Sequence, residues 1–329
     1  MTLAQPSPAR LRETTHPLRG YLYIATATFF WGVSAVMGRA VFTGRLLFRG
    51  HAVGSIDPLI LSQSRTTLSL IFLLPILLLP GRQGLLKLSR SDVSRMALLG
   101  VFGLAAANYF YYLAIQKTNV ATAITVQYTA PVWVLLYMVV RGFQKPTIQK
   151  LASVALAVIG IAIAIGMFNK GEAHLNSIGV VAALLAAFSY AFYNIGGHSM
   201  VARHDHWTVM LYMMLAASVF WLILNPPWKI VAAHFSARQW LFLAVFSLTS
   251  MLIPFSFYFA GLRHLEPTRA IVASCLEPIF SILIAAVVLG ETVRPVQSVG
   301  MIMVLAAIIV VQLPQAKSGK LNLEKSRLT

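Results

Sequence analysis

Residues Pro267–Glu291 have the sequence PTRAIVASCLEPIFSILIAAVVLGE, and this stretch decides the fold class. At about 1.5 Å per residue, 20 or so apolar residues in a helix cross a hydrocarbon core roughly 30 Å thick. One carboxylate, Glu277, stands in the middle of the stretch, directly before Pro278. An acid at that depth costs on the order of 3 kcal/mol, so it needs a partner, a proton or a water-filled cavity. We therefore expect a membrane span that contains an unusual carboxylate.

The composition of the whole chain is that of a membrane protein. Hydrophobic residues make up 58% of the 329 residues and charged residues only 11%, whereas soluble domains contain about 25% charged residues. The single cysteine, Cys275, excludes an internal disulfide and a cysteine-based zinc site. The excess of 26 Lys+Arg over 9 Asp+Glu fits loops that face anionic lipid. No basic stretch is interleaved with stacking aromatics, so nucleic acid is not an expected partner.

Ten apolar segments, separated by polar or turn-rich breaks, predict an all-α polytopic protein with ten transmembrane helices. The first five are expected near Tyr21–Val41, Pro58–Leu79, Val93–Ala114, Asn119–Val140 and Thr147–Phe168. The second five are expected near Ile178–His198, Trp207–Leu224, Trp240–Leu262, Pro267–Leu289 and Pro295–Leu313. Residues 1–20 contain no apolar signal-peptide core, so we expect them and residues 314–329 to form tails outside the membrane.

Loop charge predicts the orientation. With the amino terminus inside, 17 of the 26 Lys+Arg residues fall in inner segments, 7 in outer loops and 2 within spans. Because Lys and Arg concentrate in cytoplasmic loops, this asymmetry predicts a multi-pass membrane protein with both termini in the cytoplasm. The oligomeric state is left open.

The two halves of the chain resemble each other. A shift of 147 residues aligns two aromatic motifs and two prolines, namely Tyr111-Tyr112-Leu113-Ala114 with Tyr258-Phe259-Ala260-Gly261, and Pro131 with Pro278. Each copy holds five spans, in residues 21–168 and 178–313. An odd number of spans makes the second copy enter the membrane from the opposite face. The predicted architecture is therefore an inverted repeat of five helices, which is typical of secondary transporters.

The most specific motif is Gly261-Leu262-Arg263-His264-Leu265-Glu266-Pro267-Thr268-Arg269-Ala270, followed by Leu276-Glu277-Pro278 and Leu289-Gly290-Glu291. In this order and with Phe30-Trp31-Gly32 and Arg65 in the first half, the chain resembles the drug/metabolite transporter superfamily, and within it the EamA-type ten-helix carriers. The resemblance covers about residues 21 to 312. It implies export of a small organic solute across a bacterial inner membrane, with spans one, four, six and nine lining the central path.

Three features depart from the pattern of this family. Gln144 stands where the first repeat usually ends in glutamate, and Ala130 precedes Pro131 where the second copy has Glu277. Any charge chemistry at the two prolines is therefore asymmetric. The connection between Arg39 and Pro58 is also longer than usual, and the role of residues 43–57 in this outer loop is left open.

Several residues within the predicted spans are candidates for function. Pro131 and Pro278 each remove a backbone donor, which either kinks a lipid-adapted helix or marks a binding site near the midplane. Glu277 would bind a substrate ammonium, take up a coupling proton or hold a neighbouring helix. Arg65 would bind a substrate carboxylate or join helices. The predicted substrate-binding set is Trp31, Arg65, Asn108, Gln127, Tyr128, Trp133, Tyr190, Asn194, Glu277 and Phe280.

The function that these features favour is a secondary transporter, exporting amino acids or related metabolites by alternating access. His204-Asp205-His206 lies in a short loop without further metal ligands, and no nucleotide-binding or hydrolase motif occurs. We therefore expect no enzyme activity, no cofactor and no metal, and transport that runs on gradients with proton coupling as one option. The alternatives are a membrane receptor or assembly subunit, or an intramembrane lipid-modifying enzyme.

Overall fold

The computed structural model describes residues 16–42, 47–48, 51–52, 56, 58–78, 88–117, 120–165, 176–289 and 293–313. The expected tail segments 1–15 and 314–329, and the Gly290-Glu291 exit of the opening stretch, lie outside these residues. The first half contains α1 (Pro17–Phe42), α2 (Pro58–Leu78), α3 (Arg90–Leu98), η2 (Leu99–Ala105), α4 (Ala106–Lys117), α5 (Val120–Gln127), α6 (Ala130–Val140) and α7 (Ile148–Ala164). The second half contains α8 (Ser177–Val201), α9 (His206–Leu224), α10 (Pro227–Ala232), α11 (Ala237–Ser247), η3 (Leu248–Leu252), α12 (Ile253–Leu262), α13 (Pro267–Ser274), α14 (Leu276–Leu289) and α15 (Pro295–Val310).

The predicted all-α architecture of two inverted five-helix repeats is confirmed. Seven helices in the described residues are long and apolar enough to cross a membrane, and three shorter apolar helices complete the set of ten spans. Spans three, four, eight and nine each consist of consecutive segments: α3–η2–α4, α5–α6, α11–η3–α12 and α13–α14. The first helix begins at Pro17 rather than at Tyr21, because proline suits the first turn of a helix, where its missing N–H is not needed.

The interruptions of the spans recur at matching places in the two halves. The segments α5 and α13 end at Gln127 and Ser274, which the 147-residue shift pairs with each other. The π-helical segments η2 and η3 likewise interrupt the third and the eighth span. Since π-helical turns and broken helices occur often at functional sites, these positions direct attention to the centre of the molecule.

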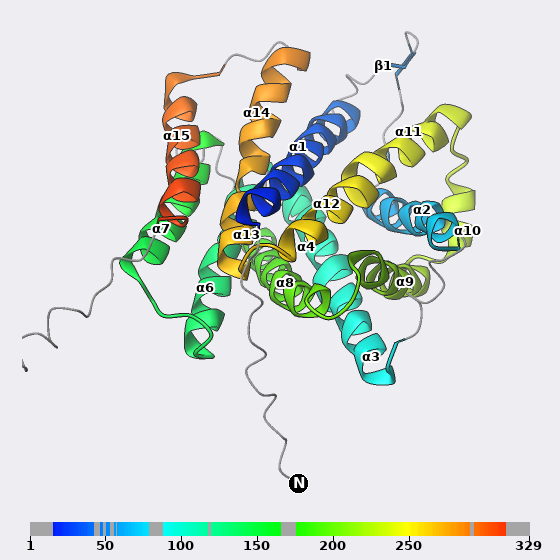
Figure 1. Cartoon of the computed structure of the whole chain (residues 1–329). Helices are drawn as coiled ribbons and strands as arrows, with labels where there is room; N and C mark the ends of the chain where they lie inside the picture. Colours follow the sequence, from blue (N-terminus) through cyan, green and yellow to red (C-terminus); the bar gives the residue numbers. More distant parts are fainter. Residues whose placement is uncertain are drawn as a thin grey trace, which may run out of the picture.

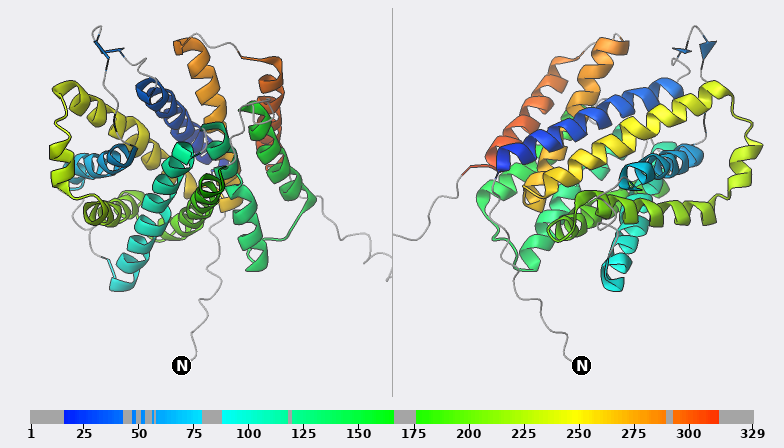
Figure 2. Two further views of the ribbon diagram at one scale, coloured as in Figure 1. Left: turned by 180° about the vertical axis from the view of Figure 1, so that it is seen from behind. Right: turned by 45° about the vertical axis from the view of Figure 1, so that its right-hand side comes forward.

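Close contacts between small residues hold the helices together. On the left of Figure 1, α7 and α15 lie side by side, and a Cβ added at Gly160 would come within 2.9 Å of the Gly300 carbonyl oxygen. The first helix packs along α12 and α14, as the right-hand view of Figure 2 shows for α12. A Cβ at Gly32 of α1 would lie 2.9 Å from the Phe280 Cβ. The two halves are therefore packed into each other.

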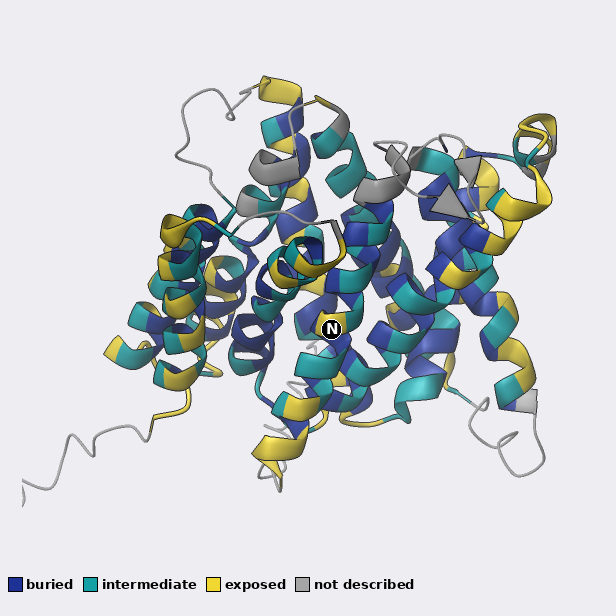
Figure 3. Ribbon diagram, turned by 90° about the horizontal axis from the view of Figure 1, so that it is seen from above, coloured by how far each residue is buried: buried dark blue, intermediate teal, exposed yellow. Residues whose placement is uncertain are grey.

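The exterior of the helices is apolar. Figure 3 shows buried residues between the helices and exposed residues on the outer helix faces and at the ends. Large hydrophobic side chains on these outer faces are more than half exposed, among them Leu22, Ile223, Val287 and Ile302. Such a surface suits lipid, because a soluble protein rarely exposes so much contiguous apolar area. The connection between α1 and α2 contains a short antiparallel hairpin of β1 (Leu47–Phe48) and β2 (His51–Ala52).

Candidate functional site

The two helix breaks meet in the interior of the protein. The Tyr128 hydroxyl, at the break between α5 and α6, donates a 2.5 Å hydrogen bond to Oε2 of Glu277, just after the break between α13 and α14. Tyr128 is 3% exposed. Glu277 keeps partial exposure although buried Cys275 and Ile279 lie two residues to either side. The one carboxylate inside the predicted spans is therefore held by the opposite half of the molecule.

Hydroxyl groups satisfy part of the backbone at each break. Pro131 and Pro278 supply no N–H to the turns before them. Thr129 donates from Oγ1 to the Val126 carbonyl at 2.7 Å, and Ser274 donates from Oγ to the Ile271 carbonyl at 2.7 Å. These hydroxyl groups thus add polar contacts in the turns that contain the breaks, as is usual where a proline interrupts a span.

Helix α8 places further polar groups beside this pair. The Tyr190 hydroxyl donates to Ser274 Oγ at 2.7 Å, and the Tyr190 ring lies edge-on to the Tyr128 ring, with centroids 6.3 Å apart. One helical turn further along α8, the Asn194 amide donates to the Tyr258 hydroxyl. Tyr190 and Asn194 are both buried. The hydrogen bonds therefore continue from the break in α13 across α8 to α12.

Trp31 of α1 packs against two aromatic residues of α12, one of which is Tyr258. The Trp31 ring lies 5.2 Å from the Phe255 ring and 5.3 Å from the Tyr258 ring, measured between centroids. Trp31 is 7% exposed. Aromatic pairs at these distances add to the stability that burial of the rings provides. The first helix therefore contacts Tyr258, the residue whose hydroxyl accepts a hydrogen bond from Asn194.

Arg65 of α2 is the charged counterpart of Glu277. It is 8% exposed and donates from one terminal nitrogen to the Tyr112 hydroxyl at 3.0 Å and from the other to the Ser250 carbonyl at 2.8 Å. Its guanidinium also lies 5.9 Å from the centre of the Phe246 ring. Ser250 belongs to η3, where the altered helical hydrogen bonding leaves a carbonyl for a side-chain donor.

Two donors around Arg65 have no acceptor in the described part of the chain. These are the Nε–H of Arg65 itself and the hydroxyl of Ser250, both buried. Both groups can still donate a hydrogen bond to an acceptor that approaches Arg65. Arg65 and Glu277 lie within electrostatic range of each other, yet their described partners are different: Tyr112 and Ser250 for Arg65, and Tyr128 for Glu277. The two opposite charges are therefore held by different residues.

Three of the predicted site residues, Asn108, Gln127 and Phe280, are not joined to this cluster by a described side-chain contact, whereas Trp133 donates from Nε1 to Thr129 Oγ1 at 3.3 Å. Asn108 donates to the Leu104 carbonyl of its own helix at 2.7 Å, and Gln127 ends α5. Trp133 packs against Phe188, which is 45% exposed, with 4.3 Å between ring centroids. Phe280 packs at 5.6 Å against the exposed ring of Phe29. Trp133 and Phe280 thus contact residues of the lipid-facing surface.

Sequence reasoning left Tyr112, Ser250, Tyr258 and Ser274 out of the predicted set. Tyr258 was visible in the repeat, where it matches Tyr111, but nothing marked it as the acceptor for Asn194. Ser250 contributes a backbone carbonyl to Arg65, and a carbonyl freed by a π-helical turn has no residue signature. Only the packing of α2 against η3 reveals this contact.

The charged groups at the loop of residues 202–205 have structural partners. His204 lies 3.1 Å from Asp92 of α3, and Asp205 caps α9 by accepting from the Trp207 N–H. In the described residues no group of three or more His, Cys, Asp or Glu side chains is arranged to hold a metal ion. Asp205 instead acts as a helix cap, for which a carboxylate beside the first N–H groups is well suited.

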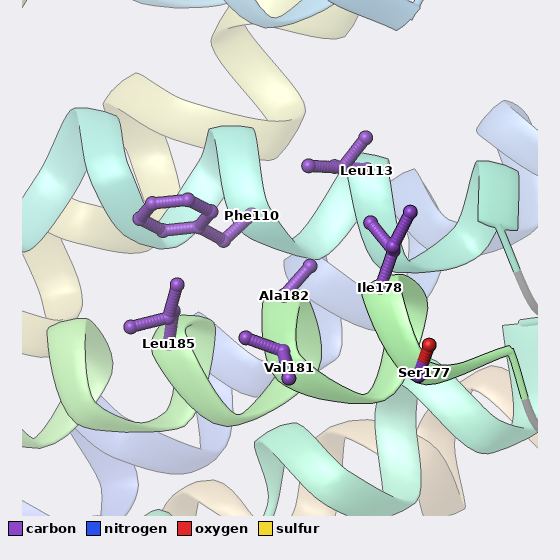
Figure 4. A pocket seen from close by; sticks show the side chains of 7 residues that line it. All are labelled: Phe110, Leu113, Ser177, Ile178, Val181, Ala182 and Leu185. Carbon is purple, nitrogen blue, oxygen red and sulfur yellow. The ribbon is translucent and has the colours of Figure 1, made fainter.

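An apolar groove of about 320 Å³ lies on the outside of α4 and α8. Figure 4 shows Phe110 and Leu113 of α4 facing Val181, Ala182 and Leu185 of α8 across it. Its lining contains the Ser177 hydroxyl but no charged residue. The lining of the groove includes neither Tyr128 nor Glu277.

Comparison with known proteins identifies the family. The sequence profile of the EamA-like transporter family matches residues 18–166 and again residues 177–313. The chain belongs to this family. The two matches correspond to the two sets of five spans, so the family resemblance seen in the motifs is confirmed.

Two relatives and one solved structure place the protein further. The chain is 24% identical over 234 residues to an uncharacterised inner membrane transporter, YicL, of Salmonella typhimurium, covering 70% of this chain and 77% of that protein. It is 27% identical over 224 residues to the threonine/homoserine exporter RhtA of Escherichia coli, covering 67% and 71%. A crystal structure with 18% identity superposes with a TM-score of 0.70 over 89% of this chain and 97% of the other, which shows a shared fold.

These matches establish the general class of the protein. The chain is a multi-pass membrane protein and a transporter of the drug/metabolite transporter superfamily.

Proposed function

We propose that this transporter exports a small amino acid or a related zwitterionic metabolite by alternating access between its two halves. The observation that carries the proposal is that Arg65 and Glu277, a base and an acid within the spans, have separate partners, Tyr112 and Ser250 for Arg65 and Tyr128 for Glu277. A zwitterion carries complementary charges a few ångströms apart. The similarity to a threonine/homoserine exporter supports the same substrate class.

Each end of such a substrate has matching groups. A carboxylate would accept from the Arg65 Nε–H and the Ser250 hydroxyl, two neighbouring buried donors that have no acceptor among the described residues. An ammonium would donate to the Glu277 carboxylate, whose Oε2 already accepts a hydrogen bond from the Tyr128 hydroxyl. Hydrogen bonds to charged groups contribute about 1.5–3 kcal/mol each, enough to select a zwitterion over a neutral analogue.

The energy source and orientation belong to the same proposal. The sequence has no nucleotide-binding motif, so the substrate would move on ion or solute gradients, with Glu277 as the candidate proton carrier. The distribution of loop cations supports both termini in the cytoplasm of a bacterial cell with the protein in the inner membrane.

Flux in proteoliposomes tests the proposal. Amino acids and related metabolites are first screened by thermal shift on purified protein, and stabilising compounds are then tested for uptake and for counterflow of labelled substrate. We expect saturable counterflow by at least one amino acid. A stabilising ligand that is never exchanged would show a receptor or assembly subunit instead, and conversion of a lipid substrate would show an enzyme.

The variant Glu277→Gln separates the two roles of the carboxylate. The amide keeps the size of the side chain and a partner for Tyr128 but loses the charge. If Glu277 binds the substrate ammonium, counterflow falls by about tenfold or more, since a charged hydrogen bond of about 1.5 kcal/mol is lost. Normal counterflow with reduced gradient-driven uptake would assign only proton coupling to Glu277. Wild-type kinetics in both assays would remove it from the site.

A further inference from the structure

A polar cluster joins the two halves of the protein at the face where α1 begins. Gln144, in the turn between α6 and α7, donates from Nε2 to Oε2 of Glu266 at 3.1 Å. Its Oε1 accepts from Lys150 Nζ of α7 at 3.0 Å and from Thr268 Oγ1 of α13 at 3.0 Å. Lys150 also lies 3.8 Å from Glu266, which precedes α13. These four residues are called the latch below.

The latch is built from fixed backbone on both sides. Gly142 has a φ of +70°, a left-handed conformation that favours glycine, and its N–H bonds the Val139 carbonyl to end α6. The Gln144 N–H then returns to the Met138 carbonyl at 3.0 Å. On the other side Glu266 is the residue before Pro267 at the start of α13. The side chains therefore meet without a long flexible loop.

Basic side chains around Glu266 stabilise the contact between Glu266 and Lys150. Lys150 is 7% exposed although it carries a charge, and burial of an ammonium is tolerated only where it has partners. Arg269 and His198 also lie within electrostatic range of Glu266 or Lys150. Glu266 is the carboxylate that balances this group of basic side chains in the described part of the face. Breaking the latch would leave a buried cation without its acceptors.

The amide at position 144 has a specific role in this arrangement. A glutamine side chain donates to Glu266 and at the same time accepts from Lys150 and Thr268. A glutamate at the same place would have no donor and would set two carboxylates against each other. Glutamine at position 144 therefore makes three hydrogen bonds here, whereas glutamate, which the first repeat of the family usually has, could not donate to Glu266.

The latch connects directly to the helix break at Glu277. Helix α13 runs for 8 residues from the latch to the break at Cys275, which is about 12 Å at 1.5 Å per residue. Pro278 weakens the hydrogen bonding between α13 and α14. A segment fixed at one end by side chains and joined at the other through a broken helix tilts as a unit when the side-chain contacts are released.

We propose that Gln144, Lys150, Glu266 and Thr268 form the inner gate of the transporter, and that their release lets α13 tilt about Cys275 and opens a path from this face to Tyr128 and Glu277. The gate rests on the proposed transport function, because alternating access requires one face to close while the other is open. The ion pair between Lys150 and Glu266 and the hydrogen bonds of the Gln144 amide together set the fraction of molecules in which the gate is open.

The native cysteine reports on the gate without any substrate. Cys275 is the single cysteine of the chain and is fully buried at the break. We would measure its labelling by a membrane-impermeant maleimide in wild-type protein in lipid nanodiscs and in the variants Gln144→Ala and Lys150→Glu. Loss of a hydrogen bond to a charged group shifts a two-state equilibrium by about tenfold, so we expect labelling about tenfold faster in each variant.

Two further variants make the test specific. The charge swap Lys150→Glu with Glu266→Lys restores the opposite charges, so labelling should return to near the wild-type rate. Asp92→Asn removes an ion-paired carboxylate from a different place on the chain, beside Arg203 and His204, and should leave Cys275 labelling unchanged. Cys275→Ser gives the background. Thermal unfolding in detergent checks that each variant is folded.

The outcomes separate the gate from the transport function. Unchanged labelling in Gln144→Ala and Lys150→Glu, or a charge swap that labels as fast as Lys150→Glu, would overturn the gate. Equally fast labelling in Asp92→Asn would also overturn it, since it would show general loosening. If wild-type protein exchanges no substrate while the labelling pattern holds, the transport proposal fails and the gate stands as a conformational contact.

Discussion

Arg65 is bound by three groups from two other spans, the Tyr112 hydroxyl, the Ser250 carbonyl and the Phe246 ring. A lysine has a single nitrogen and cannot reach the first two acceptors together. We expect Arg65→Lys to lower the free energy of unfolding by about 1.5–3 kcal/mol, the contribution of one hydrogen bond to a charged group. Chemical or thermal unfolding in detergent measures this loss.

The same variant also tests whether Arg65 binds ligand. If its Nε–H recognises the substrate carboxylate, the stabilisation by a bound amino acid should shrink as well. Arg203→Lys is a matched control, because Arg203 is an exposed arginine whose ion pair with Asp92 lies at the surface. Exposed ion pairs contribute about 0–1 kcal/mol, so the control should unfold like the wild type. An Arg65→Lys protein with both properties unchanged would contradict the assigned contacts.

The central side chains were only partly predictable from the sequence. Glu277 was identifiable because an acid deep in an apolar stretch is costly, and Pro131 and Pro278 because the repeat aligns them. That Tyr128 donates to Glu277 depends on the two breaks facing each other, and this follows from the packing of spans four and nine. Trp133 and Phe280 were included because they lie on spans four and nine. The neighbours of each ring were not available from the sequence, and the place of both residues in the site stays a prediction.

The broken helices carry the next prediction. Pro278→Ala returns an N–H to the turn at the break and allows α13 and α14 to join into one continuous helix. We expect the variant to be more resistant to unfolding and at least several-fold slower in transport, because a straight span nine would no longer tilt at Cys275. Unfolding midpoints and counterflow rates on the same preparation measure the two effects.

A second proline provides the control for this experiment. Pro75 lies inside α2 on an exposed face and has no proline at the matching position of the other half. Pro75→Ala should change stability in the same direction while transport stays near the wild-type rate. Equal losses of transport in both variants would show that straightening any span is harmful, and the particular role of the break at Pro278 would be lost.

The ten spans were predictable as elements, whereas their internal interruptions were less so. Apolar length and turn residues locate each span to within a few residues, as Trp207–Leu224 and α9 (His206–Leu224) illustrate. The breaks at Gln127 and Ser274 follow from proline chemistry. The π-helical segments η2 and η3 have no comparable residue pattern, because one extra residue in a turn is stabilised by neighbouring helices rather than by its own side chains.

The molecule as a whole combines an inverted repeat with an uneven distribution of charge. The net charge is +17, and the predicted inner segments hold more than twice as many Lys and Arg residues as the outer loops. Because five spans separate equivalent points of the two halves, the end of α7 and the start of α8 are expected on the face opposite to the start of α1. Gln144 and Glu266, which contact each other, are on the same face by this count, in agreement with their hydrogen bond.

The orientation of the termini is the last prediction. Alkaline phosphatase needs disulfides that form outside the cytoplasm, so it reports on the location of a fusion point. Phosphatase fused within the α7–α8 connection should be active, and phosphatase fused at the carboxyl terminus or in the turn between α8 and α9 should be inactive. Green fluorescent protein at the carboxyl terminus should fluoresce. An active phosphatase at the carboxyl terminus would reverse the orientation, and the latch would then close the outer face instead of the inner one.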